Sequence, residues 1–271
     1  MMESKKVLFV SQEITPYLPE TELSFISRTL PQAIQETGME IRTFMPKYGN
    51  INERRNQLHE VIRLSGMNLI IDDTDHPLII KVASIQAARM QVYFIDNEEY
   101  FHRKHTVADS RGRFFEDNDE RMIFFARGVL ETVRKLRWSP DLVHCHGWFT
   151  SLVPLYIKKA YREDPLFADS SVVFSFYDNG FDVPLDQGFA SKLLVDGVSP
   201  KHVSMIEEPV YENLVSLATT YSDGLVRGSA SLPDSVSRVL DKSGKPVMNY
   251  ISGEKYVEAF SVFYDKIMNS Q

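Results

Sequence analysis

The sequence predicts an α/β protein, a three-layer Rossmann-like domain built on a mostly parallel sheet. Short apolar runs typical of buried parallel strands alternate along the chain with stretches in which apolar residues recur every three or four positions. The first strand, helix and strand together take about forty residues, a length that suits a βαβ unit with a right-handed crossover. Such alternation favours helices packed against a parallel sheet.

The first half of the chain gives the clearest unit. KKVLFVSQE (5–13) and MEIRTFMP (39–46) predict buried strands. Between them one helical face carries Leu23, Ile26, Leu30, Ala33 and Ile34, and Gly38 stands where a C-terminal cap glycine belongs. Residues 53–95 then hold three strand-like runs, HEVIRL, LIIKVASI and MQVYFID, which indicate a hairpin or sheet extension of undetermined strand order.

The second half repeats the alternation. Residues 117–136 predict an amphipathic helix with Asp117 and Asp119 in its first turn, where the helix dipole favours negative charge. PDLVHCH (140–146) and SSVVFSFYD (170–178) predict strands, and FTSLVPLYIKKAY (149–161) between them predicts a helix. Function in such sheets gathers at the carboxyl ends of the strands, where Gln12–Glu13, His146 and Tyr177–Asp178 fall.

The tail has a different composition. DKSGKPVMNYISGEK mixes glycine, proline, serine and lysine, which is typical of a linker. KYVEAFSVFYDKIM then predicts a final amphipathic helix. We therefore expect a Rossmann-like domain over 1–240, a linker over 241–254 and a final helix over 255–271.

Composition excludes several classes of protein. The chain has 271 residues and a formal net charge of −7, which argues against a nucleic-acid partner. Its one cysteine cannot form an internal disulfide and suits a reducing compartment. The apolar run VLFV is too short for a membrane span or a signal sequence, so we expect a soluble, cytoplasmic protein with no membrane partner.

The run His144-Cys145-His146 invites a metal or catalytic interpretation. Alternate residues of a strand point the same way, so only the two histidines converge, whereas zinc needs three or four ligands. The cysteine lies inside a predicted buried strand, and the chain has no G-x-S-x-G, P-loop or G-x-G-x-x-G motif. We expect no metal and no cofactor.

Several motifs resemble the N-terminal half of bacterial glycogen and starch synthases. KKVLFVSQEITPYLPETEL is similar to that family's opening strand and S-E-x-x-P-[FY]-x-K-T-G-G-L loop, and FEDNDERMIFFARGVLE resembles its D-N-x-x-R-F helix. PDLVHCHGWFTSLVPLYIK resembles P-D-[IV]-V-H-x-H-D-W. The resemblance covers about 5–240, and it implies a GT-B fold and glucosyl transfer from ADP-glucose to an α-1,4-glucan.

The loop that binds the sugar nucleotide in that family is altered. Its K-T-G-G positions carry Pro19, Glu20, Thr21 and Glu22 here. Proline lacks an amide donor, side chains replace both glycines, and two carboxylates would face a diphosphate. We therefore expect a degenerate phosphate loop.

Other positions are altered or retained. H-D-W becomes His146-Gly147-Trp148, and I-H-N becomes Phe176-Tyr177-Asp178, while Asp117 matches a family carboxylate expected near the glucose hydroxyls. The resemblance marks His146 and Asp117 as remnants of a catalytic site. It marks as substrate-binding candidates Glu13, Asp117, His146, Trp148 and Tyr177.

The synthases run to about twice this length, and their second Rossmann domain supplies the groups that bind the leaving nucleotide. The tail resembles their C-terminal crossover helix, so we expect the linker over 241–254 to replace that second domain and the helix over 255–271 to pack on the domain over 1–240. The face uncovered by its loss is then a candidate surface for a homodimer or a partner chain.

Three functions remain open from the sequence. The first is the acceptor-side half of a split glucosyltransferase completed in trans. The second, which the altered loop favours, is a non-catalytic carbohydrate-binding or regulatory module for a glucan or another small molecule. In such a module the aromatic residues of VYFIDNEEYFHRKH could stack on sugar rings, and the alternative is that they pack in the core. The third is a structural role for the uncovered face.

Overall fold

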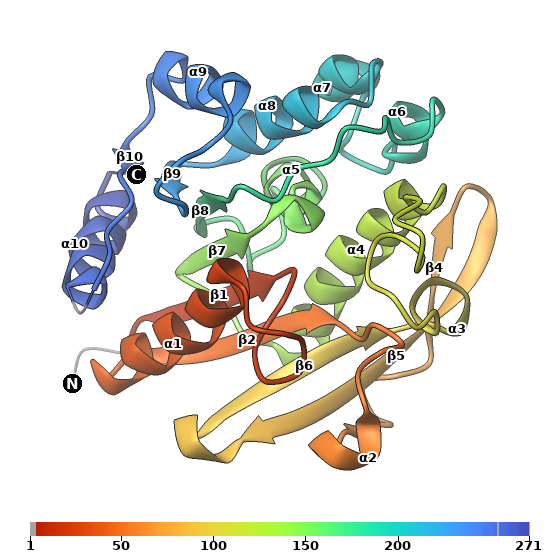
Figure 1. Cartoon of the computed structure of the whole chain (residues 1–271), viewed down its shortest axis with the longest axis horizontal. Coiled ribbons are helices and arrows are strands. Elements are labelled where there is room, and N and C mark those ends of the chain that lie inside the picture. The colour runs from red at the N-terminus through yellow and green to blue at the C-terminus, as the bar shows by residue number, and fades with distance from the viewer. Residues whose placement is uncertain (1–3, 254, 271) are drawn as a thin grey trace.

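A single mixed sheet forms the centre of the computed structural model, which describes residues 4–253 and 255–270 (Figure 1). In the described part it has ten strands in the order β10-β9-β8-β7-β1-β2-β6-β5-β3, with β4 paired to β5. The strands are β1 (Lys6–Ser11), β2 (Glu40–Pro46), β3 (His59–Glu60), β4 (Met67–Ile71), β5 (Thr74–Ile85), β6 (Met90–Asp96), β7 (Leu142–His146), β8 (Ser171–Phe176), β9 (Gly224–Arg227) and β10 (Val247–Met248).

The strands from β10 to β6 in this order are parallel, and β5 and β3 add an antiparallel edge. The α-helices are α1 (Glu22–Glu36), α2 (Glu53–Asn56), α3 (Glu98–Phe101), α4 (Asn118–Leu136), α5 (Leu152–Lys158), α6 (Phe189–Lys192), α7 (Pro200–Val203), α8 (Tyr211–Tyr221), α9 (Asp234–Lys242) and α10 (Tyr256–Met268). Short 3₁₀ turns are η1 (Gln86–Ala88), η2 (Trp148–Thr150) and η3 (Ser204–Ile206).

Helices cover both faces of the sheet, as a three-layer fold requires. Leu30 and Ile34 of α1 and Phe260 of α10 pack in one cluster with Val7 and Phe9 of β1. The opposite face packs in a larger cluster with α4, α5 and α8. Strand alternation directs His144 and His146 to the α1–α10 face and Cys145 to the other face.

The predicted α/β class and mostly parallel sheet are confirmed, including the first βαβ unit. The structure corrects details elsewhere. Of HEVIRL only 59–60 is a strand, and β4 lies in a stretch where no strand was predicted. The helix predicted over 149–161 is shorter, because the backbone of Lys159 leaves the helical region and Tyr161 N–H bonds back to Tyr156 O.

The tail crosses back to the sheet. Residues 247–248 form β10 beside β9, so the stretch predicted as a linker adds a strand at the sheet edge. Helix α10 lies next to α1, as Figure 1 shows at the blue end of the chain, and it buries four side chains there: Phe260, Phe263, Tyr264 and Ile267. Residues 1–3, 254 and 271 of the expected domain ranges lie outside the described residues. No helix among the residues described could cross a lipid bilayer.

Candidate functional site

A cavity of about 430 Å³ opens at the carboxyl ends of β1, β8 and β9. The segments that follow these three strands meet there with the beginning of α1, at the edge where parallel sheets carry their ligands. The lining residues are Glu13, Thr21, Glu22, Leu23, Tyr177, Asp178, Asn179, Ser229, Ala230 and Ser231. The lining thus combines three carboxylates with hydroxyl and amide groups, and it contains no lysine, arginine or histidine.

Thr21 joins two parts of this lining. Its Oγ1 accepts the N–H of Ser24 at 3.0 Å, which caps the N-terminus of α1, and it donates to Glu13 Oε2 at 3.1 Å. Burial raises the pKa of Glu13, and the Thr21 hydroxyl partly opposes that rise. The altered loop therefore forms an ordered helix cap that is tied to a pocket carboxylate.

Glu22 is bonded to groups of its own chain. Ser229 Oγ donates to Glu22 Oε2 at 2.5 Å and accepts the N–H of Asp178 at 3.2 Å. The Glu22 carboxylate also raises the pKa of Tyr250, a residue of the tail that lines a neighbouring cavity together with Glu22. The first residue of α1 thus connects the segments after β8 and β9 and lies beside the tail.

His146 lies behind the pocket rather than in its wall. Its Nδ1 is 2.8 Å from the Tyr177 hydroxyl, and its ring is fully buried. Burial lowers the pKa of His146 to about 3, so the ring is neutral at pH 7. Nε2 is buried without a hydrogen-bond partner among the described residues.

His144 continues a buried polar chain toward α10. Its ring packs against that of His146 with the ring planes tilted by 39° and the centroids 3.9 Å apart, and its Nε2 is 2.7 Å from Ser175 Oγ. Its Nδ1 is 2.6 Å from the Tyr264 hydroxyl. Burial, followed by the neighbouring His146, lowers the pKa of His144 well below its usual range. Both histidines are therefore buried and neutral, and the described residues contain no cluster of three or more His, Cys, Asp or Glu side chains that could hold a metal ion.

Gly147 replaces the family's aspartate, and the surrounding packing leaves no room for a side chain. Its φ is +84°, and a Cβ would lie 2.6 Å from Leu23 Cδ1 and 2.8 Å from Gln12 Oε1. Gln12 Oε1 accepts the N–H of Phe149 at 3.2 Å. The space for a carboxylate at this position is thus occupied by Leu23 and Gln12.

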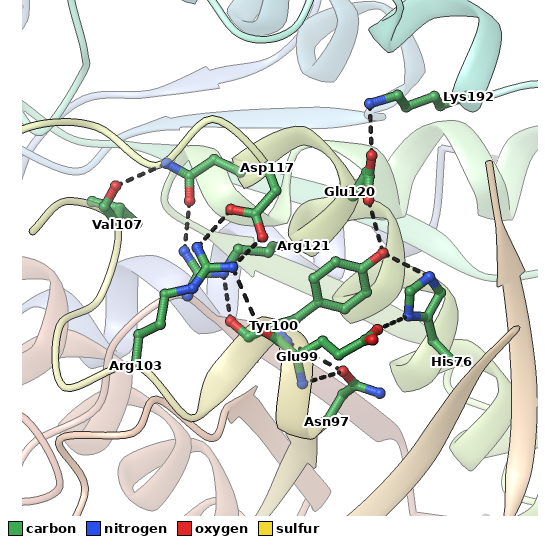
Figure 2. Close-up of polar contacts among 11 residues, drawn as sticks. His76, Asn97, Glu99, Tyr100, Arg103, Val107, Asp117, Glu120, Arg121 and Lys192 are labelled. Carbon is green, nitrogen blue, oxygen red and sulfur yellow. Dashed lines mark hydrogen bonds and ion pairs between the residues drawn. The ribbon is translucent and has the colours of Figure 1, made fainter. Parts of the chain in front are cut away.

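Asp117 does not line the cavity but lies in the polar network drawn in Figure 2. Both terminal nitrogens of the Arg103 guanidinium contact its carboxylate, and Nη1 lies 2.6 Å from Asp117 Oδ1. Beside it, the buried Arg121 donates to Asn118 Oδ1 at 2.6 Å and to Tyr100 O at 2.7 Å. Asp117, which precedes α4, is therefore engaged by a cation of its own chain.

The structure brings together five of the strand-end and loop residues singled out from the sequence: Glu13, Thr21, Glu22, Tyr177 and Asp178. Pro19 and Glu20 are exposed outside the lining, and Trp148 is buried 4.8 Å from the Phe181 ring. The aromatics at 93, 94, 100 and 101 are buried, so they pack in the core and offer no stacking platform to a sugar. Sequence reasoning missed Asn179 and Ser229–Ser231, although the apolar run GLVR followed by GSAS is itself a strand-end signal.

The chain is similar in sequence to known proteins of one family. Residues 6–239 match the model of the starch synthase catalytic domain family. Glycogen synthase of Chlorobium luteolum is 37% identical over 222 residues, which are 79% of this chain and 45% of that protein. Glycogen synthase of Chlorobium phaeovibrioides is 33% identical over 258 residues, which are 92% of this chain and 52% of that protein.

A solved structure is similar in fold. The catalytic domain of starch synthase IV from Arabidopsis thaliana, bound to ADP and acarbose, matches with a TM-score of 0.74 and 18% identity, over 93% of this chain and 52% of that chain. The fold is thus that of a GT-B glycosyltransferase catalytic domain. The chain belongs to the glycogen and starch synthase family, as the sequence motifs predicted. It spans about half the length of these relatives, or less.

Proposed function

We propose that this chain binds a neutral carbohydrate in the cavity at the carboxyl ends of β1, β8 and β9, and that it does not transfer glucose from ADP-glucose by itself. The observation that carries the proposal is the lining of that cavity. It has three carboxylates, Glu13, Glu22 and Asp178, and no cationic side chain.

This lining disfavours a diphosphate. Two like unit charges 4 Å apart repel by about 1 kcal/mol in bulk water and about 4 kcal/mol at the effective dielectric near a protein surface. The first turn of α1 already holds its own carboxylate, Glu22, and Thr21 caps it. A ligand phosphate would therefore find neither a free positive helix end nor a counter-charge here.

Sugar hydroxyls suit the same groups. Carboxylates accept hydroxyl donors in strong, charge-assisted hydrogen bonds, and the cavity volume falls in the range of small-molecule sites. Asn179 Oδ1 is a further acceptor, with no hydrogen-bond partner in the described part of the chain. Acarbose, which is bound in the starch synthase IV structure, and maltooligosaccharides are the natural probes.

Thermal unfolding with each ligand separately tests the proposal. A ligand at a hundred times its Kd stabilises the native state by about 2.7 kcal/mol, which raises the midpoint by a few degrees for a chain of this size. We expect a rise with maltooligosaccharide or acarbose and none with ADP-glucose. Asp178→Ala should abolish the rise, whereas Asp182→Ala, exposed and outside the lining, should keep it.

The reverse result would overturn the proposal. A rise with ADP-glucose alone would favour the acceptor-side half of a split glucosyltransferase, completed in trans by a nucleotide-binding chain. No rise with any of these ligands would favour an assembly role.

A further inference from the structure

A second cavity, of about 500 Å³, lies at the opposite edge of the sheet. Two segments form it: the residues that follow α5, and the loop before α7 together with the first residues of that helix. Lys158, the last residue of α5, forms an ion pair at 2.7 Å with Asp223, which directly precedes β9. The cavity therefore lies near the amino ends of the strands, far from the candidate carbohydrate site.

Its lining is cationic in a chain that is acidic overall. Three basic side chains, Lys159, Arg162 and Lys201, line it together with His202, and two carboxylates, Glu163 and Asp196, complete it. None of these five charged side chains has an ion pair or a hydrogen bond among residues 4–253 and 255–270. By contrast, Lys192 contacts three carboxylates within 3.3 Å. The cationic groups of this cavity are free for a ligand.

The cavity is held in shape by contacts of its own backbone. Gly197, at φ +84°, packs so closely on the segment after α5 that a Cβ would lie 2.6 Å from Lys159 O. The Lys159 ammonium lies 5.6 Å from the centroid of the Tyr221 ring, whose hydroxyl donates to His202 O at 2.8 Å. Two of the lining groups are thus positioned before any ligand arrives, which reduces the entropy lost on binding.

His202 presents a donor to the cavity. Its Nδ1 accepts the N–H of Ser199 at 3.1 Å, so in the neutral ring Nε2 carries the proton. Desolvation and the charges of Lys159 and Lys201 lower the pKa of His202. The neighbouring charges that act on this ring are cationic, which indicates that the ring lies in a positive potential.

We infer that this cavity binds a small phosphate monoester whose organic part carries hydroxyl groups. Lys159, Arg162 and Lys201 match the charge of the phosphate, and a guanidinium pairs with its oxygens in a bidentate manner. The carboxylates of Glu163 and Asp196 repel a bare anion but accept hydroxyl donors. A ligand with both features therefore fits the lining better than inorganic phosphate does.

Isothermal titration calorimetry at low ionic strength, with glycerol phosphate, inorganic phosphate and glycerol, tests this site. We expect glycerol phosphate to bind, inorganic phosphate to bind more weakly, and glycerol not to bind. The double variant Arg162→Gln/Lys201→Gln should weaken glycerol phosphate at least tenfold. The matched double variant Arg63→Gln/Lys242→Gln, which removes two exposed cations elsewhere, should bind as the unchanged chain does.

A further double variant separates the contribution of the ligand's hydroxyl groups to binding from that of its phosphate. Glu163→Gln/Asp196→Asn should bring the affinities for glycerol phosphate and inorganic phosphate together, and the His202 ring resonances should shift on addition of either one. Glycerol phosphate binding that survives the loss of Arg162 and Lys201, or no binding up to concentrations on the order of 10 mM, would overturn the inference.

Discussion

The Tyr264 hydroxyl lies 2.6 Å from His144 Nδ1, although 120 residues separate them in the chain. The other ring nitrogen of His144 lies 2.7 Å from Ser175 Oγ. The His144 ring packs against the ring of His146, whose Nδ1 lies 2.8 Å from the Tyr177 hydroxyl. One buried polar chain therefore connects α10 with the residues directly behind the carbohydrate site.

Removing the Tyr264 hydroxyl should destabilise the fold. Tyr264→Phe leaves His144 Nδ1 buried without its partner, which costs about 1–3 kcal/mol. Tyr17→Phe is the matched control, because the Tyr17 hydroxyl is buried with no partner among the described residues and its loss should be neutral or stabilising. Urea unfolding of both variants measures the difference. Equal effects would show that the bond contributes nothing.

The free energy of unfolding should fall as the pH is lowered, because His146 is buried as a neutral ring. Burial lowers the pKa of the folded ring to about 3 from its usual 6.5, so unfolding takes up a proton between these values. The stabilisation is complete above pH 6.5 and is lost as the pH falls, by about 2 kcal/mol between pH 7 and 5 for one such histidine. Urea unfolding across this range measures it.

His146→Asn keeps a partner for Tyr177 but cannot titrate, so the pH dependence should lessen by that amount. His59→Asn, at an exposed position, should leave the slope unchanged. An unchanged slope in His146→Asn would mean that the ring does not stay neutral in the fold.

Restoring a side chain at Gly147 should be costly. Gly147→Ala and Gly38→Ala both place alanine at positive φ, which costs about 1–2 kcal/mol, but Gly38 has no atom within 4 Å of its Cβ position. The contacts with Leu23 and Gln12 should cost a further 1–3 kcal/mol or so at Gly147 alone. Leu23→Ala should then cost less in the Gly147→Ala background than in the unchanged chain, as measured by a double-mutant cycle. Additive effects would rule out the clash.

Glu22 should stabilise the fold although it occupies a position that is glycine in the family. Glu22→Ala removes the acceptor for Ser229 and a favourable charge at the N-terminus of α1, for a loss of about 1 kcal/mol. Glu20→Ala, exposed and without a side-chain contact in the described chain, should stay within about 0.5 kcal/mol. Thermal unfolding of the two variants checks this, and a gain in stability for Glu22→Ala would contradict it.

The sequence predicted the secondary structure correctly where hydrophobic periodicity and a family motif coincide. The βαβ unit, the helix over 118–136 and the shared direction of His144 and His146 follow from local spacing. The partners of those histidines could not be predicted, because Ser175 and Tyr264 come from distant elements. Likewise, Gly147 was visible as a departure from H-D-W, but only the packing of Leu23 and Gln12 shows that the departure is compensated.

The face of the sheet that α10 covers has a consequence for how the chain folds during synthesis. Val7 and Phe9 belong to the first strand, yet their cluster includes Phe260 and Ile267. At about 5–20 residues per second, the ribosome needs on the order of ten seconds or more to make the intervening chain. Until then α1 is the helix that covers this face, and the apolar surface that α10 buries on β1 and β7 stays exposed, so a nascent chain stalled before residue 256 should be a preferred client of chaperones.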